Sequence, residues 1–514
     1  MCNKVIKKCK LFEYPAKYST SNSGRASVLM IFVSLLFLVV IFNGIDIATA
    51  VFGLLVAFVA FAHSLLKLSS IIKPWSKTFV DVDPDYKPFV SVHVACKSEP
   101  ADIVIETVQA LTRLNYPNYE VVVIHSNNTD KPTWHKIKKY VDSCGKNYKF
   151  VHLDKIDGFK AGALNYINAY KMDKNAEVVA IVDCDYIVTP DFLNKTVGYF
   201  KDPRVGIVQA PQDYYNVNPY NIGLLYEYRS FFELVMHQAQ QLSLVTFTGT
   251  MGLIRTELLN KGLKWNEWCI TEDVEAGTYI NSIGYRGVYV DKSLGKGLMP
   301  FEYSSLIKQR QRWAYGNMQI IRKDWSNVIT NKKLSSKQKI AFFAQLATWF
   351  HFELILAVVY LAINMIQFLG YSGHYVKFTS GLMIIMIAFC IFINFIYFIV
   401  GMRKSASIFN RIKAFLVHYG LLYIMSSSWI VCLTGKKLGF IVTNKEKNLG
   451  KIPFSQYSKE FIIIVILIIG LGLSIINSGF ILLDMLVVII LSIIELIGIL
   501  YLQKAFIESN KLVI

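Results

Sequence analysis

The sequence predicts an α/β domain, with a mixed and mainly parallel sheet, inserted between α-helical transmembrane segments. Hydrophobic residues make up 54% of its 514 residues, more than a soluble enzyme carries. The long apolar runs lie almost entirely in residues 28–67, 342–400 and 460–503, whereas residues 80–335 mix polar and apolar residues as a globular domain does. This middle block is long enough for a complete catalytic core.

Seven apolar stretches are candidates for transmembrane helices, each of which needs ~20 apolar residues. They are residues 28–44, 46–67, 342–369, 378–400, 414–434, 460–479 and 481–502. Lysines precede the first stretch, so the positive-inside rule predicts a cytosolic basic N-terminus over residues 1–27. Residues 28–67 then form a hairpin that returns the chain, and the central domain is expected in the cytosol as well.

The stretch at 414–434 is expected to lie along the inner leaflet rather than to cross it. Basic residues flank it on both sides, and a crossing would place the lysine-rich strip 436–452 outside the cell, against the positive-inside rule. An interface helix over 403–435 keeps both flanks in the cytosol. A seventh span is the alternative. The sequence thus predicts a multi-pass plasma-membrane protein with about six spans, one interface helix and a cytosolic C-terminus.

The basic composition does not point to nucleic acid as a partner. Much of the formal net charge of +18 lies in short segments beside apolar runs, as in the cytosolic loops of membrane proteins. A basic interior also favours an anionic nucleotide and an anionic leaflet. The eight cysteines show no CxxC or other metal-binding spacing, which indicates reduced thiols.

The central block alternates predicted strands and helices. Short runs rich in β-branched residues predict strands, and the amphipathic runs between them predict helices. The strands are residues 89–96, 120–126, 149–153 and 177–183, and the helices are 101–114, 132–143 and 160–171. Such alternation implies a mainly parallel sheet that binds ligands at the carboxyl ends of its strands.

Two aspartates, Asp183 and Asp185, follow the last of these strands in the sequence DCD. Taken alone, such a pair more often forms a turn or caps a helix. Here a buried strand leads the pair directly into the crevice where ligands bind, and two carboxylates can hold a hard divalent cation that bridges two phosphates. We therefore expect Asp183 and Asp185 to bind a metal ion.

A second acidic group, TED at residues 271–273, follows the tryptophan-rich segment KWNEWCI. A hydroxyl group that attacks a sugar must lose its proton to a positioned carboxylate. Asp273 is the candidate base, and Glu272 is expected to support it. The start of a helix is the alternative reading of this triplet.

The motif QRQRW, residues 309–313, gathers polar and aromatic side chains at helical spacing. An arginine such as Arg312 can hold a diphosphate through two parallel hydrogen bonds. Trp313 offers an apolar face on which a sugar ring can stack. A basic helix that lies on the inner leaflet before the next span is the alternative.

Together these motifs resemble the membrane-integrated processive family-2 glycosyltransferases of the cellulose synthase group. They follow that family's order over roughly residues 85–450. They are GFKAGALNY (158–166), DCD (183–185), VGIVQAPQDYYN (205–216), FTGTMGLIR (247–255), TED (271–273), QRQRW (309–313) and FIVTNK (440–445). The resemblance implies a cytosolic glycosyltransferase-A-type domain and a gating loop, residues 436–452, that closes over the nucleotide.

The resemblance also implies a role for individual residues. Asp185, with Asp183 nearby, would hold Mg²⁺ or Mn²⁺, and Asp273, beside Glu272, would act as the base. The nucleotide would contact Glu99, Lys160, Gln309, Arg310, Arg312, Thr443 and Lys445. The acceptor would meet Trp313, which stacks on its terminus, together with Gly249 and Thr250.

The activity implied is processive, inverting transfer from a UDP-sugar to a growing polysaccharide that crosses the membrane. UDP-glucose and a β-glucan, such as a capsule polysaccharide, are the default donor and product. Inward-facing polar residues of 342–400 and 460–503 would line the channel, with Trp349 and Tyr360 as candidates for sugar stacking. Alternatives are a hyaluronan-type synthase, a non-processive enzyme that makes a lipid-linked sugar, and an inactive or transport relative. A homo-oligomer is left open.

One departure from the family pattern concerns the nucleobase. The family has an aspartate-rich turn after the second strand, but this sequence reads HSNNTD there, so His125 and Ser126 replace acids and Asp130 comes several positions late. Glu99 is then the candidate to hold the base or the ribose.

Overall fold

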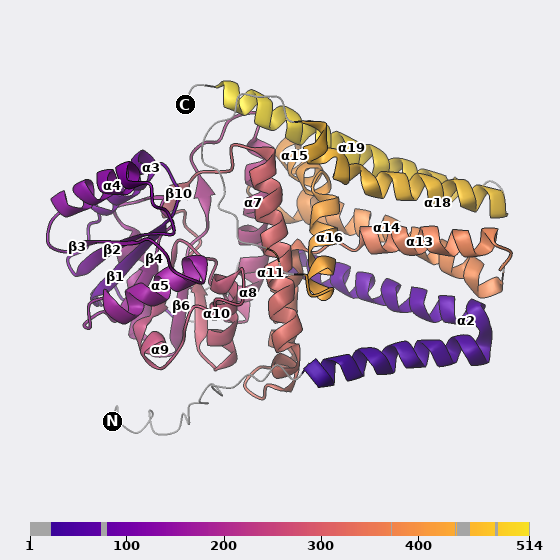
Figure 1. Ribbon diagram of the computed structural model, residues 1–514, viewed down its shortest axis with the longest axis horizontal. Helices are drawn as coiled ribbons and strands as arrows, with labels where there is room; N and C mark the ends of the chain where they lie inside the picture. The colour runs from indigo at the N-terminus through magenta and orange to yellow at the C-terminus, as the bar shows by residue number, and fades with distance from the viewer. Residues whose placement is uncertain are drawn as a thin grey trace.

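The computed structural model describes residues 22–72, 80–371, 373–436, 438, 453–478 and 482–512. An α/β domain lies at one end of the molecule and a bundle of long helices at the other (Figure 1). Helix α11 (Tyr303–Thr330) stands between the two parts (Figure 1). Any ligand held between sheet and bundle therefore has α11 as a neighbour.

A seven-stranded sheet forms the centre of the α/β domain. Its strands are β1 (Val90–Cys96), β2 (Tyr119–Ser126), β3 (Tyr148–Leu153), β4 (Val178–Ile181), β6 (Val205–Gln209), β8 (Gly252–Arg255) and β9 (Arg286–Tyr289), in the order β3-β2-β1-β4-β8-β6-β9. Neighbours pair in parallel, except that β8 is antiparallel to both β4 and β6. The expectation of a mixed, mainly parallel sheet is confirmed.

Helices cover both faces of this sheet because its strands bury side chains on both sides. Along β2, Val121 and Val123 pack into one core with β1 and α3, whereas Val122 and Ile124 pack into another with α5 and α10. Successive side chains of a strand point to opposite faces, so a run of valines and isoleucines needs a cover on each. The helices of this domain are α3 (Ala101–Leu111), α4 (Lys131–Ser143), α5 (Phe159–Tyr170), α6 (Phe192–Thr196), η1 (Val197–Lys201), α9 (Thr256–Asn260) and α10 (Glu272–Ser282).

A small sheet and several short helices connect this domain to the bundle. The sheet has the order β5-β10-β7, formed by Ile187–Val188, Gly295–Gly297 and Asp213–Tyr214. After β7 come α7 (Ile222–Ser230), the π-helical turn η2 (Phe231–Met236) and α8 (His237–Gln241). Helix α7 packs against α15 of the bundle, and α11 packs against α16. These contacts join the sheet domain to the bundle on two sides.

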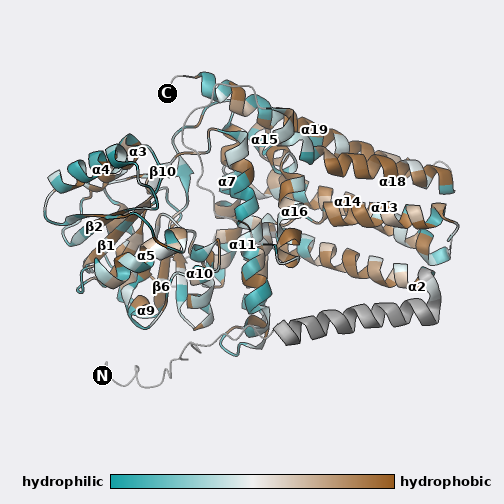
Figure 2. Cartoon of the chain, in the orientation of Figure 1, coloured by the Kyte–Doolittle hydropathy of each residue, from teal (hydrophilic) through white to brown (hydrophobic). Residues whose placement is uncertain are grey.

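The bundle contains helices that are long and apolar enough to cross a membrane. Within the described ranges, four single helices pass this test: Asp46–Ile71, His374–Gly401, Ser458–Ser478 and Leu482–Lys511. Two bent pairs pass it together: Ser336–Trp349 with Glu353–Phe368, and Ile408–Tyr419 with Leu422–Leu433. Hydrophobic residues dominate α13, α14, α18 and α19 among these helices (Figure 2). By length and composition the described residues thus indicate a membrane protein, with four such helices, or up to six if each bent pair is one span.

The bundle is formed by α2, before the α/β domain in the chain, and by the elements from α12 to α19 after it. They are α2 (Asn22–Ile72), α12 (Ser336–Leu346), η3 (Ala347–Trp349), α13 (Glu353–Phe368), α14 (His374–Ile396), η4 (Tyr397–Gly401), α15 (Ile408–Tyr419), α16 (Leu422–Leu433), α17 (Phe454–Tyr457), η5 (Ser458–Phe461), α18 (Ile462–Ser478) and α19 (Leu482–Lys511). Helix α2 doubles back at Gly44, whose φ of 77° is incompatible with a continuous helix (Figure 1).

The span expected at 342–369 is interrupted in the structure. The chain bends by 76° between Trp349 and Glu353, where α13 begins. The Glu353 carboxylate accepts the backbone N–H of Phe352 at 3.0 Å and lies 3.2 Å from His351 Nδ1, so a local contact stabilises the new helix start. The stretch at 414–434 is also bent, by 44°. Its interfacial position stays a prediction.

Candidate active site

A cavity of about 240 Å³ opens where the carboxyl ends of β1, β2 and β4 face α11. Its lining comes from the loops after these strands, the start of α10, one face of α11, and aromatic residues of α7, η2 and the bend at Trp349. The predicted site residues on this lining are Glu99, Lys160, Asp183, Asp185, Gly249, Glu272, Asp273, Gln309, Arg312 and Trp313. Residues from distant parts of the sequence thus gather around one space.

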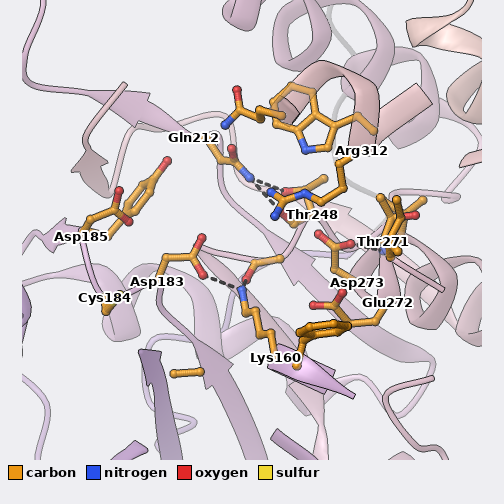
Figure 3. A pocket seen from close by; sticks show the side chains of 18 of the residues that line it. Lys160, Asp183, Cys184, Asp185, Gln212, Thr248, Thr271, Glu272, Asp273 and Arg312 are labelled. Carbon is orange, nitrogen blue, oxygen red and sulfur yellow. Dashed lines mark hydrogen bonds and ion pairs between the residues drawn. The ribbon is translucent and has the colours of Figure 1, made fainter. Parts of the chain in front are cut away.

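Lys160 of α5 organises the polar part of the cavity (Figure 3). Its Nζ donates to Asp183 Oδ1 at 2.5 Å and to the carbonyl oxygen of Gly249 at 2.9 Å. Burial acts to lower the pKa of Lys160, but the surrounding carboxylates, Asp183 first, raise it overall above the ordinary lysine value. The site therefore contains a permanently charged ammonium group that ties α5 to the turn after β4.

Both aspartates of the DCD turn line the cavity. The backbone N–H of Asp183 donates to Thr250 Oγ1 at 3.0 Å, which orients the turn, and Asp185 is largely buried. The described residues include no group of three His, Cys, Asp or Glu side chains that could hold a metal ion alone. In nucleotide sites, however, Mg²⁺ needs one or two carboxylates, because phosphate oxygens and water supply its other ligands. Asp183 and Asp185 fit an ion shared with a diphosphate.

Glu272 and Asp273 form the first turn of α10, which borders the cavity. Burial, and then the charge of Asp273, raise the pKa of Glu272 to about 7. Burial also raises the pKa of Asp273, although Lys160 and Arg312 act in the opposite direction. A carboxylate whose pKa lies closer to neutrality accepts a proton more readily than an ordinary one, as a general base requires.

One face of α11 presents the predicted residues of QRQRW to the cavity. Gln309, Arg312 and Trp313 occupy positions i, i+3 and i+4, which lie on the same side of a helix. Gln309 Oε1 accepts a hydrogen bond from the hydroxyl of Tyr228. Figure 3 shows Arg312 opposite Asp273 and Lys160, where it can reach an anionic group between them.

Arg310 does not lie where the motif suggested. Consecutive residues of an α-helix are ~100° apart around its axis, so Arg310 leaves the face shared by Gln309 and Arg312. Its side chain is 0% exposed, lies outside the cavity lining and forms an ion pair with Glu227 of α7. Because the guanidinium is enclosed in the protein interior, the structure does not bring Arg310 together with the other residues expected to contact the nucleotide.

Other predicted residues also lie away from the cavity or outside the described ranges. Thr250 is buried behind the lining, where its hydroxyl accepts the amide of the DCD turn. Tyr360 is fully buried and donates to Asp484 at 2.7 Å, so its ring offers no open face to a sugar. Thr443 and Lys445 of the expected gating loop fall outside the described residues.

The end of the cavity near β1 and β2 contains Glu99, Ser126 and Asn127. Glu99 Oε2 accepts the backbone N–H groups of Lys97 and Ser98, at 2.7 and 3.1 Å. His125 is buried away from the cavity, with its Nδ1 3.2 Å from Nδ1 of His152. The acid missing from the HSNNTD turn is thus not replaced by His125, and Glu99 supplies the carboxylate at this end.

Aromatic residues form the opposite side of the cavity. Tyr228, Phe231 and Phe232 line it without having been singled out in the sequence, and Trp349 lines it as well. The rings of Trp313 and Trp349 have centroids 4.9 Å apart. The density of aromatic residues in YEYRSFF is the signal that could have drawn attention to this segment, but nothing in the sequence places it beside α11.

Part of the sequence is similar to known proteins. Residues 87–316 match the family model described as glycosyltransferase like family 2. The chain is 25% identical over 260 residues to glucomannan 4-beta-mannosyltransferase 7 of Arabidopsis thaliana, covering 49% of this chain and 47% of that protein. It is 30% identical over 278 residues to the UDP-forming cellulose synthase catalytic subunit of Pseudomonas fluorescens (strain SBW25), covering 52% and 35%.

The match to cellulose synthase 1 of Komagataeibacter xylinus is 26% identical over 274 residues and covers 52% of this chain and 17% of that protein. Each match therefore spans about half the length of these relatives or less. Mannosyltransferase PcManGT from Pyrobaculum calidifontis, solved with GDP-Man and Mn²⁺, superposes with a TM-score of 0.48 at 20% identity, over 67% of this chain and 98% of that one. Residues 87–316 thus match the family-2 glycosyltransferase model, and about half of the chain is similar in sequence to cellulose synthases and glucomannan mannosyltransferases.

Proposed function

We propose that the protein is a processive, inverting glycosyltransferase that polymerises a hexose from a nucleoside-diphosphate sugar and passes the polymer across the plasma membrane. UDP-glucose and a β-glucan are the proposed donor and product. The catalytic domain would face the cytosol, where nucleotide sugars are made. Family membership and the relatives support sugar transfer, while the donor, the processivity and the topology belong to the proposal.

The main support for this proposed function is a single cavity that joins the charged groups of the α/β domain to an aromatic surface, which includes Trp349 of the bundle. The charged end, with Lys160, Asp183, Asp185 and Arg312, suits a sugar diphosphate. The aromatic end suits the apolar faces of sugar rings. Since Trp349 lies at the bend before α13, an acceptor held there already borders a candidate membrane span.

In this proposal the acceptor hydroxyl attacks the anomeric carbon from the side opposite the diphosphate. The new carbon–oxygen bond forms as the bond to the diphosphate breaks, so the anomeric configuration inverts and the nucleoside diphosphate leaves with the electron pair. Asp273 takes the hydroxyl proton, and Lys160 and Arg312 stabilise the developing negative charge. A bound divalent ion, held by Asp185 and Asp183, would supply further charge neutralisation.

The test uses the full chain in lipid vesicles with Mg²⁺ or Mn²⁺. UDP-glucose, UDP-N-acetylglucosamine, UDP-glucuronate and GDP-mannose are supplied separately, and nucleotide release and high-molecular-weight product are followed. GDP-mannose is included because one relative is a mannosyltransferase. The proposal predicts long polymer from UDP-glucose alone, and linkage measurement names the product.

Other outcomes would change the proposal in defined ways. Nucleotide release without polymer contradicts processive synthesis and favours a single-transfer enzyme. Polymer from another donor corrects the sugar but keeps the mechanism. No turnover with any donor contradicts a catalytic role.

A further inference from the structure

Three rings of the cavity surround the guanidinium of Arg310, which itself lies outside the lining. Its Cζ is 4.2 Å from the ring centroid of Tyr228 and 4.6 Å from those of Trp313 and Trp349. We call these three rings the aromatic wall. They come from α7, α11 and the bend after α12, so no common backbone holds them together. Arg310 is the group that all three share.

Arg310 is fixed from its other side by Glu227. The two side chains are 0% and 1% exposed, and Nη2 of Arg310 donates to Glu227 Oε2. Within the described part of the chain, Nε and Nη1 of Arg310 have no hydrogen-bond partner. Aromatic faces surround the guanidinium instead, and a buried cation is attracted to such faces by the ring quadrupole. The position of the guanidinium and the orientation of the rings therefore depend on each other.

The ion pair is connected to the bundle through a buried chain of polar contacts. His418 of α15 lies with Nδ1 3.5 Å from Glu227 Oε1 and with Nε2 3.0 Å from Lys67 Nζ. Lys67 of α2 also donates to Asn394 of α14 at 2.6 Å. A histidine that carries its proton on Nδ1 satisfies both contacts, donating to Glu227 and accepting from Lys67. Groups of three bundle helices thus reach the back of the aromatic wall.

We propose that Arg310 is a positioning residue for the acceptor sugar: its buried guanidinium holds Tyr228, Trp313 and Trp349 in one arrangement and anchors that arrangement through Glu227 to the bundle. This inference rests on the proposed polymerase function. Arg310 touches neither the nucleotide nor the sugar. It acts on the rings against which the end of the polymer packs between one addition and the next.

A positioning role for Arg310 predicts a change in polymer length without a change in the donor KM. A general structural role would change both. The donor binds at the charged end of the cavity, so its KM should not depend on the aromatic wall. Retention of the polymer does depend on the wall, since stacking holds the acceptor during each cycle. The mean polymer length, which reflects the number of additions before release, is therefore the sensitive readout.

The experiment compares Arg310→Lys with Arg322→Lys in vesicles. Lysine keeps the charge opposite Glu227 but lacks the planar guanidinium that lies against the rings. Arg322 is a matched control on the same helix, with its Nη1 donating to the Cys432 carbonyl at 2.8 Å, and it does not line the cavity. We expect Arg310→Lys to shorten the polymer about ten-fold with the donor KM unchanged, because one compact ammonium group cannot lie against three rings and pair with Glu227 at once.

A second variant keeps the test valid if the Arg310→Lys protein folds poorly. The double change Glu227→Gln with Arg310→Gln leaves no lone buried charge, which either single change would create. It should shorten the polymer to a similar extent. The inference is overturned if both variants make polymer of wild-type length, or if the donor KM rises while polymer length and thermal stability fall in parallel. If the wild-type protein itself makes no polymer from any donor, it is the proposed function that fails.

Discussion

Asp273 lies directly beside the α-carbon of Gly249: a β-carbon built on this glycine would stand 2.4 Å from Asp273 Oδ2. Gly249 also has a φ of +85°, which residues with a side chain rarely adopt. The glycine therefore leaves room for the proposed base at its working position. Its carbonyl oxygen accepts Lys160, so both sides of this peptide contribute to the site.

Gly249→Ala should lower sugar transfer by about 10²-fold, because the methyl group displaces a carboxylate whose position must be accurate to within ~1 Å. Gly262→Ala is the matched control, since Gly262 has a φ of +97° and nothing within 4 Å of a β-carbon. Both variants share the backbone strain, so their melting temperatures should fall alike. Equal activities in the two variants would contradict the role of Gly249.

Asp273→Asn should reduce transfer by ~10²–10⁴-fold, because an amide cannot take the proton of the acceptor hydroxyl. Binding of the nucleoside diphosphate, measured by calorimetry, should survive, since asparagine fills the same space. Asp102→Asn on the exposed side of α3 is the control and should behave as wild type. A parallel loss of nucleotide binding in Asp273→Asn would remove this residue from the role of base.

The pH dependence of transfer should report the pair Glu272 and Asp273. Burial and the neighbouring charge raise the pKa of Glu272 to about 7, and burial raises the pKa of Asp273. Since the base must be ionised, kcat should fall as the pH drops, with an apparent pKa above that of an ordinary carboxyl group, and this pKa belongs to the pair. Glu272→Gln removes one negative charge and should move this acid limb to lower pH. An unchanged midpoint would contradict the coupling.

The raised pKa of Glu272 also predicts the direction in which folding stability changes with pH. A carboxyl group with a raised pKa binds its proton more tightly in the folded than in the unfolded state. The contribution of Glu272 to stability is therefore present below its ordinary pKa and is lost as the pH rises toward about 7. Thermal unfolding of the wild type and of Glu272→Gln between pH 5 and 8 measures it, with the difference expected to shift in favour of glutamine as the pH rises.

Removal of divalent ions with a chelator should abolish transfer, and Mn²⁺ or Mg²⁺ should restore it, since the diphosphate needs charge neutralisation as it leaves. Asp185→Asn should raise the Mn²⁺ concentration for half-maximal activity by more than about ten-fold. Asp191→Asn is the control, because Asp191 binds Lys292 away from the cavity. Full activity in chelator would remove the metal from the proposal.

The sheet and the acidic motifs were predictable because their signals are local. Valine and isoleucine runs in β1, β2 and β4 mark buried strands, and an acid directly after such a strand must face the ligand edge of a parallel sheet. The expected strands at 89–96 and 120–126 agree with β1 and β2 to within one residue. Asp183 and Asp185 lie on the cavity lining for the same reason.

Arg310 could not be placed by its motif, although helical spacing already separates it from Gln309 and Arg312. Its partner Glu227 lies 83 residues earlier, and that contact depends on how α7 packs against α11. The bend at Trp349 could not be predicted either, since residues 342–369 form one mainly apolar run in the sequence. Packing between distant helices decides both features, and no short window of sequence contains that information.

The bend at Trp349 makes the candidate site inseparable from the bundle of candidate membrane helices. A soluble fragment ended after α11 would keep Lys160, Asp183, Asp273 and Arg312 but would lose a ring that stands 4.9 Å from Trp313. Its cavity would lack that ring on the side where the proposed acceptor sits, so we expect such a fragment to lose the proposed lengthening of a chain. The bundle is in this sense part of the candidate site and not only of its surroundings.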